Sequence, residues 1–346
     1  MKKTLLIIGR EYRQRLRRPS FWVITLLVPV LLAALYALPV AAANRSEKAV
    51  TVLVVDETGL PAGVINIVTG KGSVIGNEMA GSPKIDIVSV TGSVGAGESI
   101  MAAASKNITK VSLELGGKAP AIVCKDADLE RAAQWIVDSR IGNNGQICNN
   151  AERVYVQKEV KAAFTEILVK KMAAVKVGDV CADETVDMGP LVEARALESV
   201  TEKVERAIKQ GAKLLCGGHR VGTKGYFYAA TVLDNCTQDM DIIHEETFGP
   251  VIPLVEFDTI DQAIEWANDC EYGLASSIFT KDLNIATKAC RELEFGETYI
   301  NREHFEAIQG FHAGVKKSGI GGADGKHGVE EYLVTHVTYL DTYEDM

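Results

Sequence analysis

The longest uncharged stretch of the chain constrains its fold most. Phe21–Ala43 runs for 23 residues without a charged side chain, and about 20 apolar residues are enough to cross the hydrocarbon core of a bilayer. Residues 1–20 carry seven Lys or Arg side chains against a single Glu, and such a basic flank stays in the cytoplasm. The sequence therefore predicts one transmembrane helix at 21–43 and a single-pass membrane protein whose amino end is cytoplasmic.

The same segment allows a second interpretation, a cleavable signal peptide that ends at Ala41-x-Ala43. A buried helix of a soluble domain is disfavoured because the segment has no polar stripe to turn outward. The first sixty residues or so also resemble the start of an ABC-type exporter permease, through Glu11–Arg15 (EYRQR) and Val50–Glu57 (VTVLVVDE). That resemblance implies a permease-like junction at 44–59, although the chain lacks the further membrane helices and the P-loop of a transport system.

Length, charge and cysteine content narrow the class of protein. A chain of 346 residues can bury a sizeable core, and two domains are the natural expectation. The net charge of −9 argues against a nucleic-acid partner, because phosphate binding needs a basic face. The seven cysteines are scattered and include no C-x-x-C pair. This pattern argues against a disulfide framework and a zinc site, so no metal is expected, and a reducing compartment suits the thiols best.

From Leu60 onward, short apolar runs alternate with amphipathic stretches, which predicts an α/β fold. Three helices are indicated by apolar residues at helical spacing. The first covers Leu129–Ile136, with Asp126 or Asp128 as its cap. The second covers Val160–Val175, and the third covers Val192–Gln210 and is ended by Gly211. Strands are predicted at Arg153–Gln157 and Ala275–Thr280.

Two glycine motifs each follow an apolar run. Glycines at such turns let a backbone approach a phosphate closely, and a Ser at the start of a helix can cap it or bind a phosphate. A simple loop and a cap without a ligand remain equally open interpretations. The motifs are Gly70-x-Gly72-x-x-x-Gly76 after Val64–Val68, and Thr91-Gly92-Ser93-x-x-x-Gly97 after Ile85–Val90.

A carboxylate and a thiol supply the chemistry that the chain could perform. Glu114 lies in the alternating run VSLEL before Gly116-Gly117, and Cys148 ends the polar loop NNGQIC. A Cys nucleophile with a separate Glu base is the minimum set for forming and hydrolysing a thioester. The alternatives are a solvated Glu at a strand edge and a small buried Cys. The flexible polar loop favours an exposed sulfur with backbone N–H groups beside it.

Together with Glu246–Pro250 (ETFGP), these motifs resemble the NAD-dependent aldehyde dehydrogenase superfamily from about Leu60 to the end of the chain. The motifs L-E-L-G-G-K, G-Q-x-C and E-x-F-G-P occur in the order and at the spacing of that family. Within it, Cys148–Gln157 and Tyr299–Gly325 are most similar to the lactaldehyde/glycolaldehyde dehydrogenases. The resemblance implies an oxidoreductase that converts a small hydroxyaldehyde to its acid with NAD, through a Cys thioester.

The resemblance also implies roles for single residues. Cys148 would be the nucleophile and Glu114 the general base. Cofactor contacts are expected at Gly70, Gly72, Gly92, Ser93, Gly97, Glu246 and Phe248. The hydroxyl-bearing substrate would contact Asn149, Glu306 and His312. The alternation in Tyr332–Leu340 (YLVTHVTYL) is typical of the arm strand through which family members associate, so a homo-oligomer is expected.

The family's amino-terminal portion, with its P-W-N and K-P-S-E motifs, has no counterpart before Leu60. The expected fold is α/β: an aldehyde-dehydrogenase-like catalytic domain with an incomplete Rossmann-type cofactor domain, preceded by one transmembrane helix. The alternative function is a membrane-anchored fusion remnant with little or no dehydrogenase activity. The expected order begins with a basic cytoplasmic segment (1–20), a membrane helix (21–43) and a junction (44–59). A remnant of the dinucleotide-binding domain (60–114), the catalytic domain (115–310) and a tail with the oligomerisation strand (311–346) follow.

Overall fold

The computed structural model describes residues 61, 63–302 and 305–341. The chain divides into two units, Met1–Val68 and Thr69–Met346, and each is considered by itself. The predicted membrane helix at 21–43, the basic segment before it and the junction at 44–59 lie outside the described residues. Across the described ranges, none of the helices has the length and apolar character needed to span a membrane.

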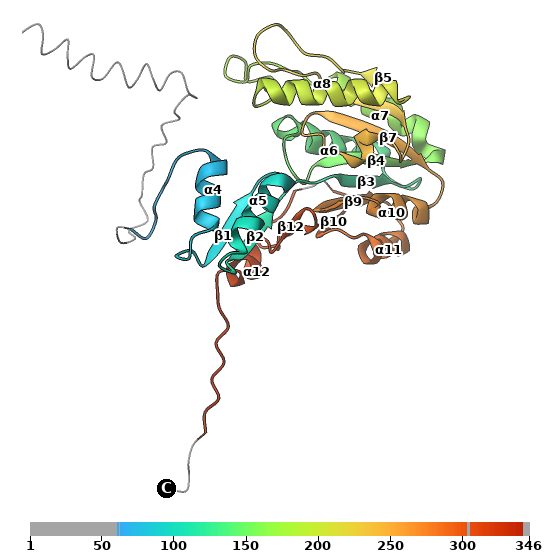
Figure 1. Ribbon diagram of the computed structural model, residues 1–346. Coiled ribbons are helices and arrows are strands. Elements are labelled where there is room, and N and C mark those ends of the chain that lie inside the picture. The colour runs from blue at the N-terminus through green and yellow to red at the C-terminus, as the bar shows by residue number, and fades with distance from the viewer. Residues whose placement is uncertain (1–60, 62, 303–304, 342–346) are drawn as a thin grey trace, which may run out of the picture. The chain divides into compact units, whose positions relative to one another are not determined.

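Helices and strands alternate through the second unit, as the sequence predicts (Figure 1). The strands are β1 (Ile87–Thr91), β2 (Lys110–Glu114), β3 (Ala119–Val123), β4 (Ala151–Gln157), β5 (Lys213–Cys216), β6 (Thr231–Cys236), β7 (Val251–Phe257), β8 (Tyr272–Gly273), β9 (Ala275–Phe279), β10 (Glu297–Ile300), β11 (Val315–Lys316) and β12 (Gly319–Ile320). The helices are α4 (Gly72–Ala80), α5 (Val94–Ala104), α6 (Leu129–Ile141), α7 (Lys161–Ala173), α8 (Ala194–Lys209), α9 (Asp241–His244), α10 (Ile260–Asn268), α11 (Leu283–Glu292) and α12 (Gly325–Glu330), with 3₁₀ turns η2 (Gly142–Gly145) and η3 (Lys158–Val160).

The largest sheet has seven strands in the order β10-β9-β3-β4-β7-β6-β5. All neighbours in it are parallel except β5, which runs antiparallel to β6. The central strands are buried along nearly their whole length. Parallel strands of this kind are covered on both faces, which is why they read as continuous apolar runs.

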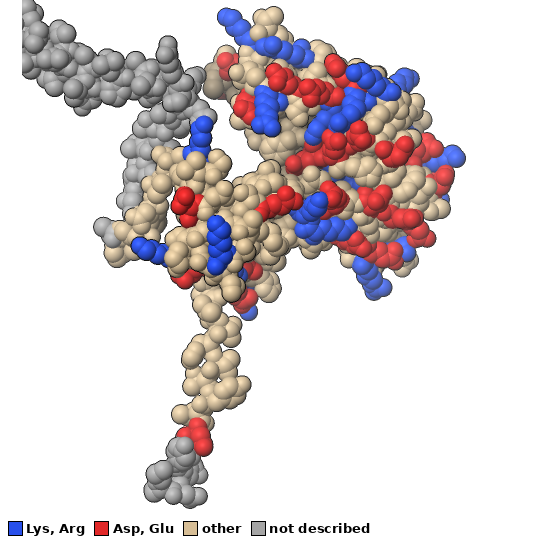
Figure 2. All heavy atoms as spheres, viewed as in Figure 1, with Lys and Arg blue, Asp and Glu red and all other residues tan. Residues whose placement is uncertain are grey.

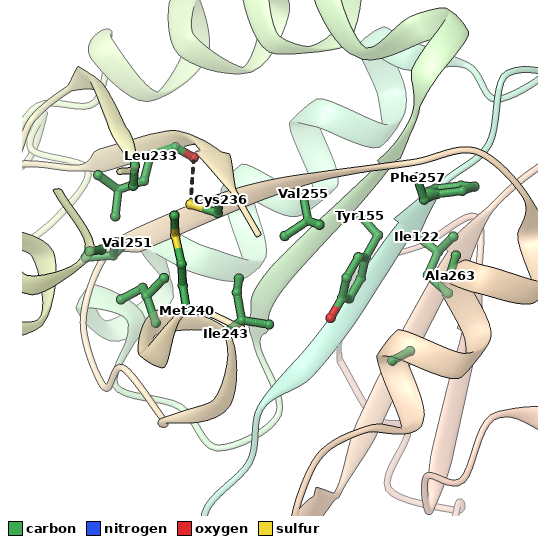
Figure 3. Close-up of a cluster of buried hydrophobic side chains, with 14 of the residues drawn as sticks. Ile122, Tyr155, Leu233, Cys236, Met240, Ile243, Val251, Val255, Phe257 and Ala263 are labelled. Atoms are coloured by element: carbon green, nitrogen blue, oxygen red, sulfur yellow. Dashed lines mark hydrogen bonds between the residues drawn. The ribbon is translucent and has the colours of Figure 1, made fainter. Parts of the chain in front are cut away.

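Side chains on successive residues of these strands enter two different cores. Ile122 and Tyr155 join the cluster beneath α8, α10 and α11, whereas Ala121 and Val154 join the cluster beneath α6 and α7. Figure 3 shows part of the first cluster, in which Ile122 and Tyr155 lie on the same side of the sheet as Ala263 of α10. The two hydrophobic cores therefore fix the strand register from both sides.

The helices begin and end where the sequence signals predict. Asp128 caps α6 by accepting a hydrogen bond from the backbone N–H of Arg131. The predicted second and third helices appear as α7 and α8, and Gly211 follows α8 with a φ of +115°. A glycine adopts this left-handed conformation without the steric cost of a Cβ.

A smaller sheet has the order β1-β2-β12. The first two strands are parallel and α5 connects them, which makes a single βαβ unit, and β12 adds an antiparallel strand from near the end of the chain. Gly97 of α5 packs directly on the side chain of Leu115, so a Cβ there would collide. The α/β expectation is confirmed, and the βαβ unit ends with Glu114 on β2.

The carboxyl-terminal segment makes no strand in this single chain. Residues 332–341 follow α12 without regular structure, and the side chains of Val334 and Tyr339 are almost fully exposed. The arm strand expected at Tyr332–Leu340 would need a partner from another chain, so its role in association stays a prediction.

Charged side chains cover the visible surface in mixed signs. Lys and Arg side chains alternate with Asp and Glu over α8, β5 and the neighbouring loops (Figure 2). Exposed ion pairs such as Lys158–Asp258 and Lys317–Glu271 contribute to this mixture, although exposed pairs stabilise a fold only weakly.

Leu168 and Leu283 provide a matched test of the core beneath α6 and α7. Leu168 of α7 is fully buried, whereas Leu283 at the start of α11 is 78% exposed. Leu168→Ala should lower the free energy of unfolding by about 2–5 kcal/mol because it leaves a cavity. Leu283→Ala should change it by no more than about 0.5 kcal/mol. Urea unfolding of both variants would measure this, and equal losses would contradict the assigned packing.

Candidate active site

The loop that presents Cys148 is built from residues that tolerate unusual backbone angles. Asn143, Asn144 and Gly145 all have positive φ, at 46°, 63° and 70°, a region that favours Gly and Asn. Asn143 Nδ2 donates to the carbonyl of Gln146, and Gln146 Nε2 donates back to the carbonyl of Asn143, both at 3.0 Å. The loop is thus folded on itself and leaves Cys148 partly exposed.

Glycines bring the three sequence motifs into backbone contact. The position of a Cβ on Gly117 is occupied by the carbonyl oxygen of Cys148. In the same way, a Cβ on Gly145 would meet the carbonyl of Gly249 in the ETFGP turn. Each approach requires the absence of a side chain. The LELGGK, GQIC and ETFGP segments therefore meet at one place although the chain separates them widely.

The Glu246 carboxylate also contacts this junction, at Gly116 and Gly117. Its Oε1 accepts a hydrogen bond of 3.0 Å from the backbone N–H of Gly117, and its Oε2 lies 2.7 Å from where a Cβ on Gly116 would be. Lys203 of α8 donates to the Glu246 backbone carbonyl. Burial raises the pKa of Glu246 above its usual value, and the nearby Glu152 carboxylate adds to the rise.

Beneath these loops lies a fully buried ion cluster. Lys118 Nζ is 2.7 Å from one oxygen of Glu152, and Arg140 Nη1 is 3.2 Å from the other. The carboxylate of Glu152 also accepts from the backbone N–H of Thr247 at 2.7 Å, and Arg140 donates to the Thr247 carbonyl. Lys118 follows the LELGG motif, Glu152 follows Cys148, and Thr247 lies inside ETFGP, so the cluster joins all three segments.

The pKa values in the cluster reflect burial and pairing. Burial lowers the pKa of Lys118 to about 8, against the opposing effect of the Glu152 carboxylate. Burial would raise the pKa of Glu152, but Lys118 and Arg140 outweigh it and hold that pKa below its usual value. Both partners are therefore predominantly charged at neutral pH, which makes each one costly to remove alone.

Glu114 ends β2 between two other strands. Its backbone pairs with Thr91 of β1 and with Gly319 of β12. The side chain is buried, and neither carboxylate oxygen has a hydrogen-bond partner within the described structure. Desolvation by burial raises the pKa of Glu114 to about 7, although His312 opposes the rise. A carboxylate poised near neutrality suits a general base.

His312 connects the candidate base to the candidate nucleophile. Its Nε2 lies 3.5 Å from Glu114 Oε2, and its Nδ1 lies 3.0 Å from Glu297 Oε1. Interaction with the Cys148 side chain, followed by that with Glu297, raises the pKa of His312 above its usual value. The structure therefore gathers the side chains of Cys148 and Glu114 around a single imidazole, with neither on a remote surface.

The other two predicted substrate residues meet at the same place. Asn149 directly follows Cys148, is almost fully buried, and donates through Nδ2 to Glu306 Oε2 at 2.7 Å. Glu306 is also one of the charges that raise the pKa of Glu114. The three residues predicted to contact substrate thus converge on the pair of reactive side chains.

The predicted cofactor residues are more dispersed. Ser93 caps α5 by accepting from the backbone N–H of Ala96 at 3.3 Å, and Gly92 N–H donates to the Glu114 carbonyl at 3.0 Å. This turn is therefore adjacent to the base. Gly97 packs against Leu115, and its N–H donates to the Ser93 carbonyl at 3.0 Å. Phe248 is 44% exposed. Gly72 begins α4, while Gly70 lies just before it and packs on Ile75.

Cys148 differs from the buried thiols of the chain. All seven cysteines are free. Burial raises the pKa of Cys124 and of Cys236 to about 12 in each case, which keeps these two thiols protonated and inert. Among the described residues, no group of three or more His, Cys, Asp or Glu side chains is placed to hold a metal ion.

Sequence reasoning missed the supporting residues Lys118, Arg140, Glu152 and Glu297. A signal for two of them was present, since Glu152 interrupts the apolar strand AERVYV and Lys118 directly precedes the buried strand APAIV. A charge in a fully buried strand must be paired. The partners themselves could not be identified, because they come from segments that meet only in the folded chain.

Comparison with known proteins places this geometry in a family. The sequence model of the aldehyde dehydrogenase family matches residues 43–338. The lactaldehyde dehydrogenase of Escherichia coli (strain K12) is 60% identical over 289 residues, which is 84% of this chain and 60% of that protein. The family match begins at residue 43, so it includes the whole segment at 44–59 that the sequence assigned to a permease-like junction.

Solved structures agree with the sequence comparison. The crystal structure of the E. coli lactaldehyde dehydrogenase superposes with a TM-score of 0.81, covering 82% of this chain and 60% of that one. A 3,6-anhydro-L-galactose dehydrogenase in complex with NAP is 49% identical (TM-score 0.77, 79% of this chain and 58% of that one). A betaine aldehyde dehydrogenase from Staphylococcus aureus in complex with NAD+ is 38% identical (TM-score 0.77, 80% and 55%). The chain thus spans about 60% of the length of the curated relatives it matches.

The predicted localisation, a single-pass membrane protein with a cytoplasmic amino end, is wrong. Residues 43–338 match a family of dehydrogenases, and 84% of the chain aligns with the E. coli enzyme. None of the helices in the described part of the chain could cross a membrane. Helices such as α8 carry charged side chains along one face, and such side chains are too costly to place in hydrocarbon.

Lys118 and Lys125 test the buried ion cluster. Lys118→Met removes one partner of a fully buried pair, and it should lower the free energy of unfolding by about 3–5 kcal/mol because Glu152 loses one of its two buried cations. Lys125 is exposed and pairs with the exposed Glu159, so Lys125→Met should change it by no more than about 0.5 kcal/mol. Urea unfolding compares the two. A Lys118→Met protein as stable as the Lys125→Met protein would refute the anchoring role of the cluster.

Proposed function

Because the chain belongs to the aldehyde dehydrogenase family, we propose that it oxidises a small hydroxyaldehyde, such as lactaldehyde or glycolaldehyde, to the acid with NAD. One observation carries the proposal: the side chains of Cys148 and Glu114 both interact with His312 in a partly open site. A nucleophile and a base with a polar group between them match the two stages of thioester chemistry.

Cys148 acts as the nucleophile. Its thiolate adds to the aldehyde carbonyl, and backbone N–H groups of the loop, including that of Cys148 itself, stabilise the oxyanion that forms. The imidazolium form of His312 supports the thiolate by placing positive charge beside the sulfur. The buried cysteines Cys124 and Cys236 cannot replace it, because burial keeps them protonated.

The substrate hydroxyl is recognised by Asn149, Glu306 and His312. Asn149 Nδ2 already holds Glu306 Oε2 at 2.7 Å, so the carboxylate is oriented before substrate arrives. A hydroxyl next to the carbonyl can donate to Glu306 while accepting from Asn149 or His312. The 60% identity to the E. coli lactaldehyde dehydrogenase supports a small hydroxyaldehyde as the substrate class.

The residues present suit a dinucleotide on the side of β1 and β2. The turn at Gly92-Ser93 leads into the amino end of α5, where backbone N–H groups favour a pyrophosphate. The half-buried carboxylate of Glu246 is fixed by Gly117 and is suited to the nicotinamide ribose, with Phe248 nearby in the sequence. When bound, the cofactor supplies the hydride acceptor. One relative is named as an NADP(+)-dependent enzyme, and the structure of another contains NAD+. We propose NAD for this chain.

Glu114 completes the reaction by activating water. Its carboxylate has no hydrogen-bond partner in the described structure, so it is free to accept a proton from a water molecule. The resulting hydroxide attacks the Cys148 thioester and releases the acid. Because burial raises its pKa to about 7, Glu114 is a stronger base than an ordinary carboxylate and still ionises at neutral pH.

The activity itself is the direct test. The purified full chain should reduce NAD when lactaldehyde or glycolaldehyde is added, and NADH absorbance measures this. Cys148→Ala should abolish the signal, whereas Cys290→Ala, which changes an exposed thiol on α11, should leave it unchanged. A signal no greater than that of Cys148→Ala, together with no heat of NAD binding in calorimetry, would favour a chain without dehydrogenase activity.

The pH profile tests the assignment of the base. The rate should fall as pH drops through about 7, because Glu114 must be deprotonated to accept a proton and its pKa is raised to that value. Glu114→Gln should lower the steady-state rate by about 10²–10⁴-fold. The same variant should retain alkylation of Cys148 by iodoacetamide. A full rate in Glu114→Gln would eliminate Glu114 as the base.

A further inference from the structure

Glu297 of β10 occupies a position that the proposed reaction does not use. One oxygen, Oε1, lies 3.0 Å from His312 Nδ1, and the other accepts a hydrogen bond of 2.6 Å from the hydroxyl of Tyr299. The carboxylate is largely buried, with 13% of the side chain exposed. A buried carboxylate held on both oxygens is a fixed acceptor, and here it faces the far nitrogen of the imidazole that meets Glu114.

The two ring nitrogens of His312 therefore have different tasks. Donation from Nδ1 to Glu297 requires a proton on Nδ1. Whenever the ring is also protonated on Nε2, that second proton lies on the side of Glu114, which is 3.5 Å away. The ring also interacts with the Cys148 side chain. The tautomer and the charge of the imidazole are both controlled by the group that Nδ1 contacts.

Further charges lie near the Glu114 carboxylate that meets this imidazole. Glu306 and Asp324 act on Glu114 from the segment after β10 and from the residue before α12. Arg302 lies over the Tyr299 ring at 5.4 Å from its centroid. The groups that act on His312 itself are Cys148, Glu297 and Glu114, and Glu297 is in hydrogen-bond contact with Nδ1.

We propose that Glu297 is a positioning residue, which orients His312 through Nδ1 and keeps the ring protonated so that Nε2–H faces Cys148 and Glu114. This inference deepens the proposed function and rests on it for the role of Cys148. Positive charge beside the sulfur stabilises the thiolate, so removing the Glu297 charge should make the thiol harder to ionise. Glu297 acts in this proposal through its contact with His312 Nδ1.

Alkylation of Cys148 tests this without requiring turnover. The full chain is treated with iodoacetamide across a pH series, and the Cys148 peptide is quantified by mass spectrometry, since the chain has seven cysteines. In Glu297→Gln the pH midpoint of Cys148 alkylation should rise by about one unit. In the matched control Glu294→Gln, which loses only the exposed pair with Lys316, the midpoint should not move.

A double-mutant cycle shows whether the effect passes through His312. If it does, Glu297→Gln should shift the midpoint in the native chain and have no further effect in a His312→Asn background. An equal shift in both backgrounds, or no shift in either, overturns the proposal. Thermal unfolding of each variant verifies folding. If Glu297→Gln fails to fold, Tyr299→Phe removes one hydrogen bond from the same carboxylate and should move the midpoint in the same direction by less, and no shift in that variant overturns the proposal.

An NADH assay on the same variants separates the two proposals. A chain that produces no NADH but shows the His312-dependent shift would refute the proposed function and leave the positioning role of Glu297 intact. A chain that produces NADH but shows no shift would support the proposed function and refute the positioning role of Glu297. In an active chain, Glu297→Gln should move the acid limb of the rate profile as well, whereas a purely structural defect would lower the rate equally at every pH.

Discussion

The buried ion cluster of Lys118, Glu152 and Arg140 is the interaction on which the site depends. These side chains are fully buried, and each leaves water only because the others compensate its charge. Glu152 and Arg140 also bind the backbone of Thr247, so one cluster ties together the segments that carry Glu114, Cys148 and Glu246. Hydrophobic burial forms the sheet and its helices, but it is non-directional. Directed ionic hydrogen bonds set the loops above the sheet to a common geometry.

Close backbone contacts at glycines also hold the three motifs together. The backbone of Gly117 lies against the carbonyl of Cys148, and that of Gly145 lies against Gly249. A side chain at either position would separate two motifs, so these glycines serve close approach rather than flexibility. Their neighbour Glu246 then fixes the N–H of Gly117. Rigid loops of this kind hold a nucleophile in a geometry that the rest of the site can use.

The chemistry of the site follows from one imidazole in a partly dry environment. His312 lies between two carboxylates and a thiol, and its interactions with Cys148 and Glu297 raise its pKa above the usual value. Burial moves the pKa of Glu114 toward neutrality, so that carboxylate exchanges protons readily. Glu297, held by Tyr299, is a fixed hydrogen-bond acceptor for the other side of the ring. The two carboxylates thus take separate roles because their surroundings differ: Glu114 has no hydrogen-bond partner, whereas Glu297 has one on each oxygen.

The sequence by itself predicted the α/β class, the presence of α6, α7, α8, β4 and β9, and Cys148 and Glu114 as the candidate nucleophile and base. These predictions depend on local signals, namely apolar periodicity, an Asp cap, a terminal glycine and short motifs. Each such signal lies within a few neighbouring residues. The same local signal misled at 21–43, where an uncharged run predicted a membrane location that the family match does not support. Only the tertiary structure decided the pairing of Lys118 with Glu152, the contact of Gly117 with Cys148, and the place of Glu297 behind His312. Each of those contacts joins residues from different segments, and their energy exists only once the chain has brought the partners together and excluded water.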